Sequence, residues 1–112
     1  MNAKALKYIL DIESILKEID EIKLRVGNNF ITYQKDFIIK RAVERDLEII
    51  GEAVKKLTEQ DSTIELSSVK KIIGLRNMIS HAYDSIEDEL IWAILQKDIP
   101  ILRKEIEKLR GQ

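Results

Sequence analysis

The segment RNMISHAY, residues 76 to 83, contains the only histidine of this 112-residue chain. His81 follows Arg76 by five positions and precedes Tyr83 by two. An imidazole can move protons near neutral pH, and a guanidinium can stabilise the charge that develops on phosphorus in a transition state. Together these residue types would suit cleavage of an RNA phosphodiester by the RNA's own 2′-hydroxyl, which requires no metal ion.

Helical periodicity places the arginine where a core residue is expected. At about 100° per residue, Arg76 and Tyr83 nearly superimpose, and both fall within the apolar arc of Val69, Ile72 and Ile79. A guanidinium buried in such an arc is costly without a carboxylate, a bound anion or a hydrated interface cavity. The arginine therefore indicates a site or an interface on this face.

The histidine falls on the other side of the same helix. His81 lies about 140° from Arg76, on a polar strip with Lys70 and Asn77. Asn77 is one turn before His81, so its amide could orient the imidazole or contact the same ligand. The long arginine side chain, or a loosened helix end, could bring both groups to one cleft, and the sequence leaves these routes open.

A purely structural explanation is also open. A histidine near a helix C-terminus often only complements the helix dipole, and an arginine often pairs with a nearby acid. Tyrosine is an ordinary core residue, and an R-x4-H spacing arises easily by chance. Catalysis would be most efficient with both a base and an acid, but the chain has one histidine. A two-fold dimer would supply two copies of His81 and Arg76 at one axis.

The motif belongs to a chain that is predicted to be all-helical. Apolar residues recur at spacings of three and four in four segments, and no segment shows the sustained alternation of a strand. The predicted helices cover residues 3–26, residues 36–57, a segment that starts after Ser67 or Ser68 as N-cap, and a segment from about Ser85 to the C-terminus. GNN at 27–29 ends the first helix, and TEQDST at 58–63 is predicted to be a polar loop.

The last apolar stripe contains Pro100. Proline removes a backbone hydrogen bond, but the stripe continues on both sides, so a kink is expected rather than an end. Short connections favour antiparallel neighbours. The sequence thus predicts an all-α, up-and-down bundle of four to five helices with the last helix kinked near Pro100, in a single domain over residues 1–112.

The amino-acid composition limits the kinds of site and partner that the chain is expected to have. The chain has no cysteine and one histidine, so we expect no metal site and no cofactor. It carries 19 basic and 20 acidic residues, so no overall positive field attracts nucleic acid. The first twenty residues lack the apolar run of a signal peptide, and LIWAIL at 90–95 is far shorter than the roughly 20 residues that span a bilayer. A soluble, cytoplasmic protein with no membrane association is expected.

Basic residues on the second predicted helix are the candidate phosphate contacts. Lys40, Arg41 and Arg45 cluster there, and with Lys70 they could contact RNA phosphates. The favoured interpretation for the two arginines is a solvated face paired with Glu44 and Glu48.

Two other features have mainly structural interpretations. Trp92 in its apolar stripe is expected to be core rather than a base-stacking platform. Glu87, Asp88 and Glu89 would suit the positive end of the fourth predicted helix, and a metal site there is disfavoured because no second histidine supports it.

The whole pattern resembles the HEPN superfamily, and specifically its HepT-like toxin family. The family motif R-x4-H-x-Y is met by Arg76, His81 and Tyr83, and its polar residue after the arginine by Asn77. The segments at 41–57, 72–77 and 91–102 are similar to the family's flanking segments in order and spacing. Two departures are Ala82, where many relatives have glycine, and ELSS at 65–68, where a proline and a tryptophan are common.

The resemblance implies a specific function. It implies a homodimer whose motif helices face one another across a positively charged cleft, with metal-independent endoribonuclease activity from Arg76 and His81 and support from Asn77. It also implies a toxin that acts on RNA such as tRNA or mRNA. Its partner would be a minimal nucleotidyltransferase antitoxin that transfers AMP to Tyr83. The alternative is a non-catalytic helical adaptor that docks such a nucleotidyltransferase, which the near-neutral net charge leaves open.

Overall fold

The computed structural model describes residues 2–81 and 87–111, and its description of side chains leaves out Val69, Arg76 and residues 79–81. The regular elements within the described residues are all helices, which confirms the predicted fold class. They are α1 (Ala3–Arg25), α2 (Phe30–Lys35), α3 (Phe37–Gln60), α4 (Val69–His81), α5 (Asp88–Gln96) and α6 (Asp98–Arg110).

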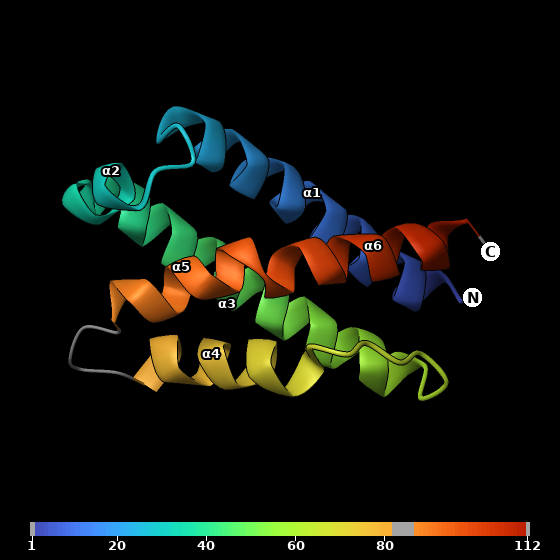
Figure 1. Cartoon of the computed structure of the whole chain (residues 1–112). Coiled ribbons are helices and arrows are strands. Elements are labelled where there is room, and N and C mark those ends of the chain that lie inside the picture. Colours follow the sequence, from blue (N-terminus) through green and yellow to red (C-terminus); the bar gives the residue numbers. More distant parts are fainter. Residues whose placement is uncertain (1, 82–86, 112) are drawn as a thin grey trace.

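Helix α3 is the centre of the bundle. It packs against α1 on one side and α4 on the other, and α5 and α6 run across these helices nearly end to end (Figure 1). Figure 1 also shows the start of α1 and the end of α6 at the same end of the molecule, opposite the end of α4 and the start of α5. The core between the helices consists mainly of isoleucine and leucine, and its largest fully buried members include Ile9, Ile12, Ile19, Leu47, Ile50, Leu57, Ile72, Ile91, Leu95 and Ile99.

The first helix has the ends that the sequence indicates. The side chain of Asn2 accepts a hydrogen bond of 2.8 Å from the Ala5 amide and caps the N-terminus. Gly27 and Asn28 adopt positive φ angles of 62° and 50°, and the Asn28 amide donates to the carbonyl of Lys23 at 2.8 Å. Glycine and asparagine tolerate this left-handed backbone, so the chain turns here.

The short helix α2 was not predicted. Asn29 caps it by accepting a hydrogen bond of 3.0 Å from the Thr32 amide. Phe30 and Tyr33 lie one turn apart and pack against Trp92 of α5, with ring centroids 5.9 Å and 5.1 Å from the indole. Trp92 is half-buried in this aromatic cluster, so the expectation that it is a core residue is confirmed.

Helix α3 begins as predicted but ends later. Asp36 caps it, since its Oδ1 accepts from the amides of Ile38 and Ile39 at 3.1 Å. The prediction of a loop from residue 58 was wrong for its first three residues, because α3 continues to Gln60. The Thr58 hydroxyl donates to the carbonyls of Val54 and Lys55, at 3.2 Å and 3.0 Å, so this polar residue is accommodated within the helix.

An interruption near Pro100 was expected as a kink within one helix, but the structure has an end and a new start there, so this expectation was wrong in kind. The last apolar stripe divides at Lys97 into α5 and α6, and Pro100 lies in the first turn of α6. Proline has no amide to donate to Gln96, so the helical hydrogen bonding is interrupted just before it. The predicted start at Ser85 lies outside the described residues, and the described helix begins at Asp88 with Asp88 and Glu89 in its first turn. Within the described residues, no helix combines the length and the apolarity needed to cross a membrane.

Candidate functional site

Arg76, Asn77 and His81 of the motif lie in the second half of α4, and Tyr83 falls outside the described residues. The backbone is α-helical from Val69 to His81, so the Cα atoms of Arg76 and His81 are related by about 140° of rotation and about 7.5 Å of rise. Ile72 and Leu75 are 1% and 3% exposed, and they fix the apolar face of α4 in the core. The motif residues up to His81 therefore belong to a regular helix.

The predicted polar strip is confirmed for its described members. Lys70 and Asn77 are both exposed. The side chains of Arg76 and His81, and the whole of Tyr83, lie outside the description, so their predicted roles remain predictions.

The end of α4 and the beginnings of α3 and α5 lie toward the same end of the molecule (Figure 1). Lys40 of α3 and Asp88 of α5 form an ion pair there, with 3.3 Å between Nζ and Oδ2. Both side chains are about a quarter exposed, at 26% and 22%. Lys40, a predicted phosphate contact, is therefore already engaged by a carboxylate.

The two arginines of α3 have the acidic partners that the favoured interpretation required. Arg41 Nη1 lies 2.6 Å from Glu44 Oε2, and Arg45 Nη1 lies 2.8 Å from Glu48 Oε1. Both arginine side chains are about 70% exposed, at 71% and 69%. The solvated, paired face is confirmed, and a role of these arginines in binding RNA stays a prediction.

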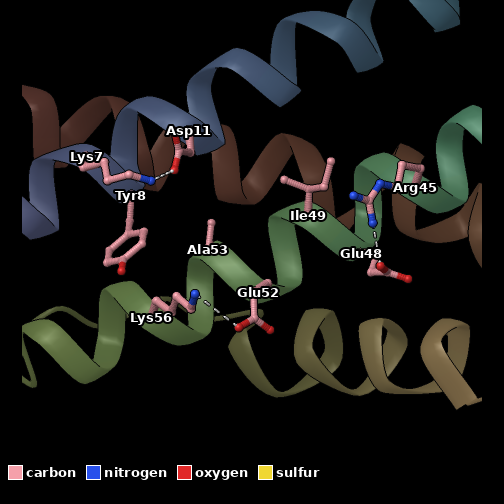
Figure 2. A pocket seen from close by; sticks show the side chains of 9 residues that line it. All are labelled: Lys7, Tyr8, Asp11, Arg45, Glu48, Ile49, Glu52, Ala53 and Lys56. Carbon is pink, nitrogen blue, oxygen red and sulfur yellow. Dashed lines mark hydrogen bonds and ion pairs between the residues drawn. The ribbon is translucent and has the colours of Figure 1, made fainter.

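Arg45 also lines the hollow drawn in Figure 2. This hollow of about 250 Å³ lies between α1 and α3, with Tyr8, Ile49 and Ala53 among its uncharged lining residues. Three ion pairs line it, and they join Lys7 to Asp11 at 2.8 Å, Arg45 to Glu48 at 2.8 Å and Lys56 to Glu52 at 3.7 Å. Each cation of the hollow thus has a carboxylate partner, and none of the residues that line it comes from α4. The hollow is separate from the motif and poorly suited to an anion.

The start of α4 is held by contacts that the sequence did not reveal. The helix begins directly after Ser68, as predicted, and the Ile72 amide donates to the Ser68 carbonyl at 2.9 Å. The hydroxyls of Ser67 and Ser68, however, donate to carboxylates of α6, to Glu105 Oε1 at 3.2 Å and to Asp98 Oδ1 at 3.4 Å. These partners are 38 and 30 residues away in sequence, so helical spacing gives no sign of them.

A buried carboxyl lies on the opposite side of α3. Asp46 is 5% exposed, and its Oδ2 has no hydrogen-bond partner among the described residues. Burial, together with a hydrogen bond to Glu18 of α1 and the charge of Glu18, raises the pKa of Asp46 to about 7, although Arg45 opposes the shift. This carboxyl belongs to the packing of α1 against α3.

Among the residues whose side chains are described, no three His, Cys, Asp or Glu side chains are grouped so that they could hold a metal ion.

Comparisons with known proteins give the family of the chain. The described residues form an all-helical bundle, and Arg76 and His81 of the R-x4-H-x-Y sequence lie in its helix α4. Residues 15–109 match the family model described as ribonuclease HepT-like. The chain belongs to the HepT-like ribonuclease family. This confirms both the resemblance and the enzyme class, a ribonuclease, that was expected from it.

Several relatives are similar over nearly their whole length. "Putative RNase TTE0752" of Caldanaerobacter subterraneus subsp. tengcongensis is 37% identical over 103 residues, which cover 88% of this chain and 89% of the relative. "Putative RNase MJ1380" of Methanocaldococcus jannaschii is 34% identical, with 87% and 94% covered. "Probable ribonuclease HepT" of Thermococcus cleftensis is 30% identical, with 92% and 93% covered. No solved structure matches the chain at a comparable level of significance.

Proposed function

We propose that this protein is a metal-independent endoribonuclease toxin that cuts RNA with Arg76 and His81. The observation that carries the proposal is the position of both residues on one regular helix, α4, inside the segment that matches the ribonuclease family. Lys70 and Asn77 on the exposed strip of α4 support it, because they offer polar contacts beside the motif.

The proposed reaction is an intramolecular transesterification. His81 takes the proton of the RNA 2′-hydroxyl, whose oxygen attacks the adjacent phosphorus while the bond from phosphorus to the 5′-oxygen breaks. Arg76 stabilises the additional negative charge on phosphorus, and an acid returns a proton to the leaving 5′-oxygen. The products are a 2′,3′-cyclic phosphate and a 5′-hydroxyl, and no metal-bound water takes part.

A homodimer supplies the acid that one chain lacks. Each chain has a single histidine, so the second His81 comes from a partner across a two-fold axis near the motif helices. Exposed apolar side chains support an interface at this end of the molecule. Met78 of α4 is 48% exposed, Leu90 of α5 is 36% exposed, and Phe37 and Ile38 of α3 are 68% and 66% exposed.

Regulation is proposed to act through Tyr83. A minimal nucleotidyltransferase antitoxin transfers AMP from ATP to the tyrosine oxygen and releases pyrophosphate. The added phosphodiester brings negative charge and bulk close to the arginine that would bind the RNA phosphate, so it competes with RNA. Tyr83→Phe is expected to remain active in the presence of the antitoxin and ATP, whereas the wild type is silenced.

The test is cleavage of a mixed RNA pool, including tRNA and mRNA, by protein shown by mass spectrometry to be unmodified. With EDTA present, the wild type should cut RNA, while Arg76→Ala and His81→Ala should be inactive and remain dimeric. Lys108→Ala is the control, because this exposed cation lies in the last turn of α6, at the end of the molecule opposite the end of α4 (Figure 1).

A different outcome would favour a different function. If unmodified wild type leaves every RNA intact, or if both motif variants cut as well as the wild type, the nuclease proposal fails. A helical adaptor that binds a nucleotidyltransferase without catalysis would then be the better explanation, and the balanced charge of the chain agrees with it.

A further inference from the structure

Two carboxylates of α6 bind the residues from which α4 begins. Asp98, the first residue of α6, is 5% exposed, and its Oδ1 accepts a hydrogen bond of 3.4 Å from the hydroxyl of Ser68, which is 7% exposed. Its Oδ2 lies 3.4 Å from Lys71 Nζ. Glu105 accepts hydrogen bonds from the amide and the hydroxyl of Ser67, at 2.9 Å and 3.2 Å. The start of the motif helix is therefore attached to one neighbouring helix by several polar contacts.

Helix α6 is itself firmly held. Ion pairs join it to α1, with Arg103 Nη2 2.6 Å from Asp20 Oδ1 and Arg110 Nε 3.1 Å from Glu13 Oε2. Its apolar face is buried in the core through Ile99, Leu102 and Ile106. A helix fixed in this way can serve as a reference for the position of α4.

The contacts to Asp98 restrain the rotation of α4. Ser68 and Lys71 are three residues apart, so they lie on one face, and both contact the same carboxylate. The bonds between Ser67 and Glu105 add a restraint along the helix axis. Arg76 follows Lys71 by five residues, so its backbone position is turned by about 140° from the face that meets Asp98. Asp98 can therefore affect the motif only through the helix.

The burial of Asp98 is not explained by packing. An apolar side chain could fill the same space without the cost of removing a carboxylate from water. A buried carboxylate also fixes an orientation that an apolar side chain would not fix. One of its oxygens contacts the Ser68 hydroxyl and the other contacts the Lys71 ammonium group.

We propose that Asp98 is a positioning residue for the ribonuclease reaction. Through Ser68 and Lys71 it sets the rotation and the height of α4, and thereby the placement of Arg76 and His81. The catalytic part of this inference rests on the proposed function.

The first test measures the kinetics of RNA cleavage. A residue that positions the catalytic groups affects kcat, whereas a residue that binds RNA affects KM. Asp98→Ala should lower kcat on the order of 10- to 100-fold, with KM within about twofold of wild type, because small misplacements of catalytic groups have large effects on rate. Asp98→Asn should recover most of kcat, since its amide oxygen can still accept the Ser68 hydrogen bond. Adding Ser68→Ala to Asp98→Ala should cause little further loss, because both changes remove the same bond.

The matched control is Glu107→Ala, which removes an exposed acid from the same helix. It should leave kcat and KM at wild-type values. If a folded Asp98→Ala has the same kcat as Glu107→Ala, the inference is overturned.

The second test requires no RNA. The chain's single histidine gives one imidazole Cε1–H signal in an NMR titration. Asp98→Ala should move the chemical shift or the titration midpoint of His81, whereas Glu107→Ala should leave both unchanged. If wild type cuts no RNA, the proposed function fails, but this signal still decides whether Asp98 positions the motif. If Asp98→Ala does not fold, Ser68→Ala replaces it, and an unchanged His81 signal in that variant rejects the inference.

Discussion

Lys40 Nζ lies 3.3 Å from Asp88 Oδ2, so an ion pair joins the first turns of α3 and α5 at the end of the molecule where α4 finishes. In this pair the positive charge of Lys40 is balanced by a carboxylate. In the proposed nuclease, RNA phosphate and Asp88 would compete for the same ammonium group.

Releasing Lys40 should therefore strengthen RNA binding. In an inactive His81→Ala background, Asp88→Asn is expected to tighten the Kd for RNA about two- to fivefold at low salt, with the gain lost as salt rises. Fluorescence anisotropy with a labelled RNA measures this. Adding Lys40→Gln should abolish the gain, and an unchanged Kd in Asp88→Asn would remove Lys40 from the list of phosphate contacts.

The stability of the fold should depend on pH through Asp46. Burial and Glu18 raise the pKa of Asp46 to about 7 in the folded protein, whereas an unfolded aspartate has a pKa of about 3.9. Between these values the folded state binds a proton that the unfolded state has released. The stabilising contribution is therefore complete below pH 4 and is lost as pH rises toward and through 7.

Asp46→Asn should remove this dependence, because the amide does not titrate. We expect the variant to be more stable than wild type at pH 8, by at most a few kcal/mol, and to show a flatter profile between pH 5 and pH 8. Urea denaturation at both pH values measures the difference. Glu21→Gln, an exposed acid of α1, is the control, and an equally steep profile in Asp46→Asn would contradict the assignment.

Tyr33 should be replaceable by phenylalanine without loss of stability. The side chain is fully buried, and its hydroxyl has no hydrogen-bond partner among the described residues. Tyr33→Phe removes the polar atom but keeps the ring contacts with Phe30 and Trp92, so the free energy of unfolding should rise by about 1 kcal/mol. Thermal denaturation measures this change. A clear loss of stability would show that the hydroxyl has a partner, and Tyr8→Phe in the open hollow is the control.

The long helices could be predicted because each buries an apolar stripe of regular period. The six-residue α2 was missed because it is too short to show a period, although Asn29 as a cap and the spacing of Phe30 and Tyr33 were available signals. The end of α3 was placed too early because Thr58 is a polar residue. Its hydroxyl bonds to the helix backbone, which composition alone does not reveal.

The motif was predicted from residue types and spacing, and the roles of its residues stay predictions, because the family match covers the segment without testing single residues. The partners of its helix could not be found in this way. No pattern in the sequence distinguishes Asp98 or Glu105 from other acidic residues, and only the packing of α6 against the start of α4 makes them contacts of Ser68 and Ser67. Side-chain contacts between two helices depend on how each helix is rotated about its own axis, and the spacing of residues along one helix does not specify this rotation.

The most direct measurement is an analysis of the RNA ends that unmodified wild-type protein produces in EDTA, by mass spectrometry of a single cleaved oligonucleotide. The proposed reaction gives a 2′,3′-cyclic phosphate and a 5′-hydroxyl, and an oligonucleotide with one 2′-deoxy residue at the cleavage site stays intact. A 3′-hydroxyl with a 5′-phosphate, or cleavage of the 2′-deoxy oligonucleotide, would contradict attack by the 2′-hydroxyl and with it the roles given to Arg76 and His81.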